Sequence, residues 1–370
     1  MKPETSSLLL MGVGGTGATA VRGVRRAYGS ALRALTVDSD ASSGNATDLP
    51  FVLLGGDRLA GRGSGGHSAE ARAAFLDKPE VLDPHLEGVR TAVIVTALGG
   101  GTGGGATSEI IKHLSSRGIA SIVFATLPFA FEGEERTNAA HAAFGTIEHT
   151  SDVVVPMPLD TLVADADTDN MKEALERAAD TLATALTLLW RILEMPGYIA
   201  LDAERLHTAI ADAGRARFAT AAAFGPNRAD DVLSSLIQSR LLSGGAARPP
   251  AKSILMGILA GDDLRLSEVA AVADGFRAAF GRRAAFQLGT VNDEATFSGR
   301  LVVAVLVFEE SAVAKSGEQR KTRRAVSTKR RNDEAALAAT DRFSDSEKTM
   351  WHDEDLDIPT YLRRNLTLDR

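Results

Sequence analysis

Cysteine is absent from this chain of 370 residues, which excludes disulfide bonds, cysteine-based zinc sites and thiol catalysis. Aromatic residues make up only 5% of the sequence, so a hydrophobic core must rely on leucine, valine, isoleucine and alanine. The formal net charge of -7 provides no overall basic surface for nucleic acid. With an ordinary hydrophobic fraction of 44%, the composition is that of a globular protein.

Long hydrophobic runs are also missing. No apolar stretch is long enough to span a bilayer. The apolar residues 8–11 are too few for the core of a signal peptide, and glycines follow them directly. We therefore expect a cytoplasmic protein, and the chain length suggests two domains with accessory segments.

Glycine, in contrast, is concentrated in short runs. Residues 99–105 consist of six glycines around Thr102; they follow an apolar stretch, 91–98, and precede a predicted helix over 107–116. Glycine tolerates positive φ and close approach, so the backbone N–H groups of such a segment can surround an anion. A helix that follows adds its positive end. The run therefore predicts a phosphate-binding loop.

A second glycine-rich loop covers residues 12–18, and a third candidate covers 61–66. A dinucleotide-binding fingerprint also has glycines in the first loop and an acidic residue after the second strand, where Asp38 and Asp40 stand. The opening loop alone therefore does not exclude a dehydrogenase. Three loops suit a triphosphate better than a pyrophosphate, although 61–66 could also be an ordinary tight turn.

Short apolar runs alternate with helical patterns in the first third of the chain, which predicts an α/β fold with a Rossmann-like, mostly parallel sheet. The expected strands cover 8–12, 34–38, 92–97, 120–126 and 153–156, and a helix covers 18–28. A long central helix is predicted by apolar residues spaced alternately four and three apart. These residues are Leu175, Ala179, Leu182, Leu186, Leu189 and Leu193.

A second, smaller α/β domain is expected after this helix. It has helical patterns over 205–214 and 229–242 and strand-like runs over 252–260, 285–290 and 301–308. The predicted segments are a first domain over 1–170, the central helix over 171–197, the second domain over 198–310, a charged linker over 311–352 and a recognition peptide over 353–370. The linker is expected to be disordered, because residues 315–331 contain eight basic residues, one acidic residue and few apolar ones.

Several of these blocks together resemble the tubulin/FtsZ family, and within it bacterial FtsZ. Residues 99–105 match the signature G-G-G-T-G-T-G except at Gly104. The opening loop is similar to G-V-G-G-G-G-G-N-A-V, with departures at Thr16, Ala18 and Thr19. Four further blocks resemble V-N-T-D-A, P-F-x-F-E-G-x-x-R, A-G-x-D-L-R-L and L-D-I-P-x-F-L-R, at residues 37–41, 128–136, 260–266 and 356–364. The resemblance covers essentially the whole chain.

The resemblance implies that the first domain binds GTP or GDP with accompanying Mg2+, and we expect no metal site made of protein side chains alone. Glu132 can accept from ribose hydroxyls and Arg136 can bind phosphate, unless both are ordinary solvated charges. The expected nucleotide-binding residues are Gly14, Gly15, Thr16, Asp40, Gly65, Gly99, Gly100, Gly101, Thr102, Gly103, Glu132, Arg136 and Asp180.

Two positions that would contact the base depart from the family. FtsZ has an aromatic residue and an asparagine on the central helix where this chain has Leu175 and Ala179. Asp180 is retained and could accept from N1 and N2 of guanine. The family's P-N-D near the ribose is P-L-D here, so Leu159 removes one hydrogen-bonding group.

The loop that completes the catalytic site of the next subunit also departs from the family. Its pattern N-x-D-x-x-D corresponds to A-L-D-A-E-R at residues 200–205. Asp202 is retained, whereas Arg205 replaces the second aspartate with a group that cannot accept a proton. Glu204 is the candidate substitute, so Asp202 and Glu204 are the candidate catalytic residues; Arg205 could instead contact a phosphate. We expect hydrolysis to be weak or lost.

The sequence thus predicts a GTP-binding protein that assembles head to tail into filaments at the inner face of the membrane. An active assembly-dependent GTPase and a non-polymerising regulator of another filament protein are the alternatives. Another FtsZ is a further candidate partner, and the basic linker could contact the membrane directly. A membrane adaptor of the FtsA type is expected to bind the terminal peptide through Leu356, Ile358, Pro359, Tyr361, Leu362 and Arg363.

Overall fold

The computed structural model describes residues 6–44, 49–163, 170–195, 197–201, 206, 210, 214–243, 251–309, 350–351 and 354–355. Contacts within the chain separate two units, Met1–Lys315 and Ser316–Arg370. In the second unit, β11 (Met350–Trp351) pairs antiparallel with β12 (Glu354–Asp355). Most of the predicted linker and the whole adaptor-binding motif, 356–364, lie outside the described residues, so the structure does not test them.

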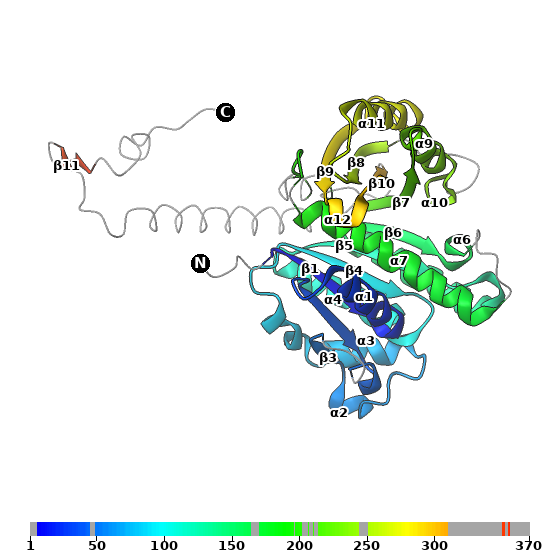
Figure 1. Cartoon of the computed structure of the whole chain (residues 1–370). Coiled ribbons are helices and arrows are strands. Elements are labelled where there is room, and N and C mark those ends of the chain that lie inside the picture. The colour runs from blue at the N-terminus through cyan, green and yellow to red at the C-terminus, as the bar shows by residue number, and fades with distance from the viewer. Residues whose placement is uncertain are drawn as a thin grey trace. The chain divides into compact units, whose positions relative to one another are not determined.

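The first unit contains a ten-stranded sheet in the order β3-β2-β1-β4-β5-β6-β7-β10-β8-β9 (Figure 1). All pairings from β3 to β6 are parallel, which confirms the predicted parallel sheet. The chain changes direction across the sheet between β1 and β4, the kind of position at which open α/β sheets bind ligands. These strands are β1 (Leu8–Val13), β2 (Ala34–Asp38), β3 (Phe51–Leu53), β4 (Thr91–Ala97), β5 (Ala120–Leu127) and β6 (Val153–Pro158).

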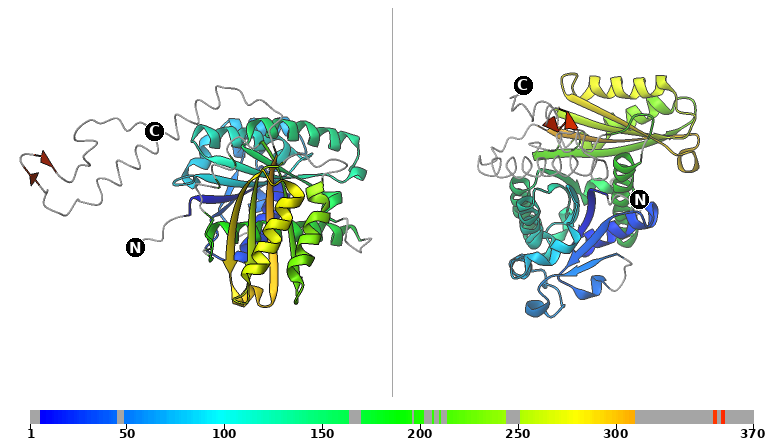
Figure 2. Two further views of the ribbon diagram at one scale, coloured as in Figure 1. Left: turned by 90° about the horizontal axis from the view of Figure 1, so that it is seen from above. Right: turned by 90° about the vertical axis from the view of Figure 1, so that its left-hand side faces the viewer.

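Helices cover both faces of this parallel part, as the two further views of the ribbon show (Figure 2). Leu8 and Leu10 of β1 pack in the cluster formed with α1 (Gly14–Tyr28) and α7 (Met171–Glu194). Leu9 and Met11 point the other way, into the cluster formed with α3, α4 and α5. Because both faces are buried, the strands are apolar throughout rather than alternating. The three helices of the second face are α3 (Ser68–Leu76), α4 (Gly101–Ser116) and α5 (Glu134–Thr150).

Short elements connect these layers. They are η1 (Ala41–Gly44), α2 (Gly56–Leu59), η2 (Pro79–His85), η3 (Ala130–Glu132) and α6 (Leu159–Leu162). None of them was predicted from the sequence, because each is too short to show a periodic pattern.

The remaining strands form a mostly antiparallel part of the sheet. Strands β7 (Gly214–Phe224), β10 (Arg300–Glu309) and β8 (Ala251–Ala260) pair antiparallel, and β9 (Ala285–Asn292) pairs parallel with β8. One face carries α9 (Arg228–Gln238) and α11 (Leu266–Phe280), and its core includes Val232, Val272 and Phe276. The short helices here are α10 (Arg240–Ser243) and α12 (Glu294–Phe297).

Strand β7 is the main element that sequence reasoning missed. A helix was predicted over 205–214, but Gly214 begins β7, and the other positions of that prediction lie outside the described residues except 206 and 210. Small residues dominate the sequence of β7, so it carries a weak strand signal. Its conformation is instead set by pairing with β10 along its length.

The central helix α7 agrees with the predicted stripe from Leu182 onward, where Leu182, Leu186 and Leu189 are buried. The prediction is wrong at the N-terminal end. Leu175 is 47% exposed, and Ala178 rather than Ala179 is buried. This first part of α7 borders a cavity instead of the sheet, which is why an apolar residue can stay accessible there.

Candidate functional site

Most of the glycine-rich run, residues 101–105, lies inside a helix, and only Gly99 and Gly100 precede it. Helix α4 begins at Gly101, not at the predicted position 107, and α1 begins at Gly14 rather than at 18. A Cβ at Gly103 would lie 2.1 Å from the carbonyl oxygen of Ala97, and one at Gly17 would lie 2.3 Å from that of Val95. Glycine is therefore required because each first turn packs directly on the backbone of β4, a contact that spacing alone does not reveal.

The first turns of α1 and α4 lie against one another. Gly14 has a φ of 76°, and a Cβ added there would lie 3.4 Å from the backbone nitrogen of Gly103. The two helices follow β1 and β4, which are neighbours at the reversal point of the sheet. The first N–H groups of a helix lack intrahelical acceptors and carry the positive end of its dipole. Two such ends in contact form a site for an anion.

A buried polar cluster attaches the third glycine loop to these helices. The Oγ of Ser39 lies 2.7 Å from the Oγ1 of Thr102 and accepts a hydrogen bond of 3.1 Å from the backbone N–H of Ser64. The hydroxyl of Thr102 donates to the Asp38 carboxylate at 2.9 Å. Thr102, which was expected to bind phosphate, thus has its hydroxyl engaged within the protein. Ser39 and Ser64 were missed because their partners are distant in sequence.

Residues 61–66 form a true loop, because Gly61, Gly63, Gly65 and Gly66 all have positive φ angles. The φ of Gly65 is 58°, and this residue is exposed. Asp40 lies beside this loop through its bridge to Arg62. Hydrogen bonds from Ser42 lower the pKa of Asp40 below its usual value, so its carboxylate is ionised at neutral pH.

Asp38 occupies the position at which the family pattern has asparagine. Its Oδ1 accepts from the Ser39 N–H at 2.7 Å, and its Oδ2 accepts from the Ser43 hydroxyl at 2.7 Å. A Cβ at Gly15 would lie 4.0 Å from Oδ2, so this buried carboxylate adjoins the first turn of α1. Carboxylate oxygens are preferred ligands of Mg2+. The described residues contain no cluster of three or more His, Asp or Glu suited to a metal. The Asp38 carboxylate is a single ligand of this kind beside the first turn of α1.

A cavity of about 340 Å³ lies beside the first turn of α1. It is bounded by α1, the ends of β4 and β5, η3 and the first part of α7. Its polar side chains come from Thr16, Thr126, Glu132 and Arg136. The other lining residues are Ala20, Ala97, Leu98, Pro128, Phe129, Phe131, Leu159, Leu175, Ala178, Ala179 and Leu182.

Arg136 lies next to the glycine-rich run, and Glu132 contacts Arg136. A nitrogen of Arg136 lies 3.0 Å from the Glu132 carboxylate, which also accepts from the Phe129 N–H at 2.8 Å. The side chain of Arg136 covers Gly99, because a Cβ there would lie 2.9 Å from its Cγ. The Arg136 side chain is 51% exposed, so it can bind a phosphate at the border of the cavity.

Asp180 is exposed and is not among the residues that line the cavity. Ala179 does line it, and a helix turns by about 100° per residue, so the two side chains leave α7 in different directions. The candidate catalytic residues Asp202 and Glu204, and Arg205 with them, lie outside the described residues. Their roles stay predictions.

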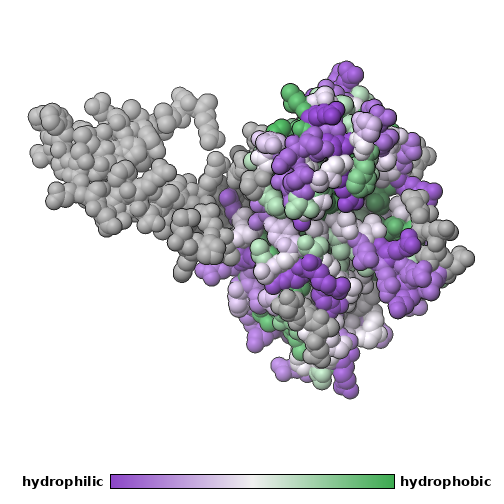
Figure 3. Space-filling view, in the orientation of Figure 1, coloured by the Kyte–Doolittle hydropathy of each residue, from purple (hydrophilic) through white to green (hydrophobic). Residues whose placement is uncertain are grey.

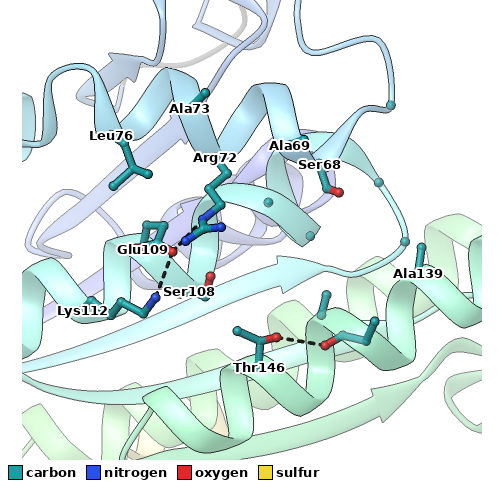
Figure 4. A pocket seen from close by; sticks show the side chains of 17 residues that line it. Ser68, Ala69, Arg72, Ala73, Leu76, Ser108, Glu109, Lys112, Ala139 and Thr146 are labelled. Atoms are coloured by element: carbon teal, nitrogen blue, oxygen red, sulfur yellow. Dashed lines mark hydrogen bonds and ion pairs between the residues drawn. The ribbon is translucent and has the colours of Figure 1, made fainter. Parts of the chain in front are cut away.

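A second cavity, of about 630 Å³, lies on the other face of the sheet between α3, α4 and α5 (Figure 4). Gly104 opens into it, because a Cβ there would have only Ala143 and the Gly99 nitrogen nearby, both at 3.9 Å. Glu109 is 7% exposed and accepts from Arg72 at 2.8 Å and from Lys112 at 2.9 Å. Burial opposes ionisation, but these two bonds outweigh it and lower the pKa of Glu109.

Among the described residues, no helix combines the length and hydrophobicity needed to cross a membrane. On the face seen in Figure 3, hydrophobic residues are scattered among hydrophilic ones. This face therefore has the mixed character usual for a protein surface in water.

Known proteins similar to this chain are consistent with the geometry. The sequence pattern of the tubulin/FtsZ family GTPase domain matches residues 7–167. The cell division protein FtsZ of Pseudomonas aeruginosa is 30% identical over 292 residues, which is 78% of this chain and 74% of that protein. The FtsZ of Coxiella burnetii is 25% identical, and the alignment covers 98% of this chain and 97% of that protein.

Solved structures share the fold. An empty FtsZ dimer from M. jannaschii has a TM-score of 0.77 at 20% identity and covers 85% of this chain and 95% of that one. CetZ2 from Haloferax volcanii, in a GTPγS-bound protofilament, has a TM-score of 0.69 at 20% identity. The match covers 88% of this chain and 99% of the CetZ2 chain. Sequence and fold thus agree, and the chain belongs to the tubulin/FtsZ family.

Proposed function

We propose that this protein binds GTP or GDP and assembles head to tail into filaments. The observation that carries the proposal is the contact between the first turns of α1 and α4, at Gly14 and Gly103, where the sheet order reverses. The phosphates would lie over these turns, with the base and ribose in the cavity beside Arg136. The terminal phosphate would then point towards Asp38 and Ser64.

Asp38 would hold the Mg2+ that accompanies the nucleotide. The Oδ2 atom of Asp38 adjoins Gly15, and its hydrogen bond from Ser43 leaves lone-pair capacity for a cation. The ion would neutralise the charge that develops on the phosphate oxygens. The protein's own contribution is to hold Asp38 in place through Ser39 and Thr102.

Head-to-tail assembly would bring the loop at residues 200–205 to the nucleotide of the next molecule. An interface between two different surfaces continues without closing and produces filaments. The names of two structural relatives, a dimer of FtsZ and a protofilament of CetZ2, support this mode of association. Nucleotide occupancy would then control polymerisation in the cytoplasm.

Hydrolysis of GTP would be weak or lost. Arg205 stands where the family has the second aspartate, and a guanidinium cannot accept a proton from the attacking water. Loss of a general base costs about 10²- to 10⁴-fold in rate. If Glu204 replaces it, the protein is instead an assembly-dependent GTPase, and phosphate release will rise steeply with protein concentration.

The C-terminal peptide would attach filaments to the inner face of the membrane, through an adaptor of the FtsA type. The support is the resemblance of residues 356–364 to the family's terminal peptide. Another FtsZ is a second candidate partner, and the basic linker is a candidate for direct membrane contact. Deleting residues 353–370 should release filaments from the membrane in cells; unchanged localisation would contradict the role of the peptide.

Calorimetry and electron microscopy test the central proposal. The full chain is titrated with GTP, GDP and NAD in the presence of Mg2+, and the same samples are imaged. We expect guanine nucleotides to bind and filaments to form with GTP. Binding without filaments would favour a non-polymerising regulator, which co-sedimentation with a second filament protein would detect. Capture of NAD in place of GTP would favour a dehydrogenase.

A further inference from the structure

We infer that the base cavity accepts adenine nearly as well as guanine, so the site is a purine nucleotide site with little base discrimination. The inference rests on the proposed nucleotide binding and concerns the 340 Å³ cavity beside α1. Three features of this cavity matter for base selection: its hydrogen-bonding groups, the contacts these groups already make within the protein, and its apolar surface.

Guanine differs from adenine at its hydrogen-bonding edge. Its N1–H and 2-amino groups are donors, and a site that selects guanine places an acceptor, most often a carboxylate, opposite both. Glu132 is the carboxylate that the cavity offers among the described residues. Its Oε1 accepts from the Phe129 N–H at 2.8 Å, and its Oε2 lies 3.0 Å from Arg136. These two contacts hold Glu132 beside Arg136, the residue proposed to bind phosphate, so we assign its remaining lone pairs to the ribose hydroxyls rather than to a base.

Arg136 is assigned to a phosphate, and the two threonines of the cavity do not select guanine either. Thr126 is 2% exposed, so its hydroxyl is hardly accessible to a ligand. Thr16 is exposed, and its hydroxyl can both donate and accept, so it suits either purine. Thr19, which stands where the family's opening loop has asparagine, is bonded to the carbonyl of Gly15 at 3.0 Å and accepts from Arg22 at 2.8 Å.

Helix α7 presents hydrocarbon to the cavity. Leu175, Ala178, Ala179 and Leu182 line it and follow the spacing of one helical face. None of these side chains has a polar atom. Asp180, the carboxylate expected to accept from guanine, leaves the helix in another direction and is exposed. Leu159 adds a further apolar contact from the start of α6.

Aromatic and aliphatic surface is what remains to hold a base. Phe131 is 64% exposed and stacks on Phe129, with ring centroids 5.0 Å apart. Leu175, 47% exposed, lines the same cavity. Stacking tolerates any base, since every base has a π face. A site built for hydrogen bonds rejects the wrong partner by about 10⁴- to 10⁵-fold, whereas apolar contact discriminates by about 10- to 200-fold.

A displacement assay tests the inference. The full chain with Mg2+ is loaded with a fluorescent GDP analogue, and unlabelled GDP, IDP and ADP are added in turn. We expect dissociation constants within about tenfold of one another, with no penalty for IDP, which lacks the 2-amino group. A preference for GDP over ADP of about 10⁴-fold would overturn the inference and leave the proposed function standing. Failure of all three nucleotides to bind would overturn the proposed function.

Variants on α7 provide the second arm. Ala179→Asp places a carboxylate, which can only accept, on the cavity wall, and it should raise the preference for GDP over ADP at least tenfold. Asp180→Asn should leave that preference unchanged; a selective loss of GDP affinity would overturn the inference. Leu175→Phe should raise the affinity for GDP and for ADP equally, because the added ring can stack on either base. Its matched control is Leu76→Phe on α3, because Leu76 has a similar exposure. This variant should change neither the GDP affinity nor the ADP affinity.

Discussion

The two cavities that border the glycine-rich run differ in how their polar groups are satisfied. The cavity beside α1 has about half the volume of the α3–α4–α5 cavity. The first turn of α1 borders the smaller cavity, whereas residues at the start of α4 line the larger one. In the larger cavity, Arg72 and Lys112 already neutralise Glu109. A ligand would have to break those pairs. Side-chain chemistry, rather than volume, is therefore the ground on which we propose the smaller cavity for the nucleotide, because Glu132 and Arg136 line it.

The largest effect is expected from the glycines that touch the backbone. Gly103→Ala should abolish nucleotide binding and destabilise the protein by more than about 2 kcal/mol, because its Cβ meets the carbonyl of Ala97 at 2.1 Å. Calorimetric affinity and thermal unfolding measure both effects. Gly104→Ala is the matched control in the same turn, since its Cβ enters open space. Normal binding by Gly103→Ala would show that α4 does not pack as described.

Asp38→Asn should alter the dependence of nucleotide affinity on Mg2+. Removing the buried charge next to the proposed phosphate position should strengthen GDP binding in the absence of Mg2+. The increase in GDP affinity that Mg2+ causes should in turn be about tenfold smaller than in the wild type. Titrations with and without Mg2+ measure the change. Glu109→Gln, which neutralises a buried carboxylate in the other cavity, is the control and should not affect nucleotide binding. An unchanged response to Mg2+ in Asp38→Asn would exclude Asp38 as a ligand.

Arg136→Ala should weaken nucleotide binding by about tenfold, because a charge-assisted hydrogen bond to phosphate is lost. The matched variant is Arg72→Ala, which removes an arginine of the larger cavity with a similarly exposed side chain. It should leave affinity unchanged. Equal losses in the two variants would indicate a general electrostatic effect instead of a contact with the nucleotide.

Acid should remove the stabilisation that Glu109 provides. Its pKa is lowered in the folded protein, so the contribution is complete at neutral pH and is lost as the pH falls from about 5 through the lowered pKa. The wild type should therefore lose more stability between pH 6 and pH 3 than Glu109→Gln does. The difference should be below about 1 kcal/mol, because Arg72 and Lys112 are largely solvated. Denaturant unfolding of both proteins between pH 6 and pH 3 measures the difference. Parallel dependence of the unfolding free energy on pH in the two proteins would contradict this role of Glu109.

The smallest effect is expected from Gly104→Thr, which restores the residue of the family signature. The side chain would enter the α3–α4–α5 cavity, where the nearest neighbours of a Cβ are 3.9 Å away. Stability should change by no more than about 0.5 kcal/mol and nucleotide affinity by less than about twofold. A large loss of nucleotide affinity would mean that the two cavities are coupled through the glycine-rich run.

Local sequence was enough to predict the α/β fold, the parallel strands and the glycine-rich turns that follow β1 and β4, because periodicity and glycine content are properties of neighbouring residues. The start of α4 at Gly101, the engagement of Thr102 by Asp38, the direction of Asp180 and the strand β7 depend on segments far apart in the chain. Ser39 and Thr102, for example, are 63 residues apart and share a hydrogen bond of 2.7 Å. Such contacts form only when the sheet brings its strand ends together, so they could be found only in the folded molecule.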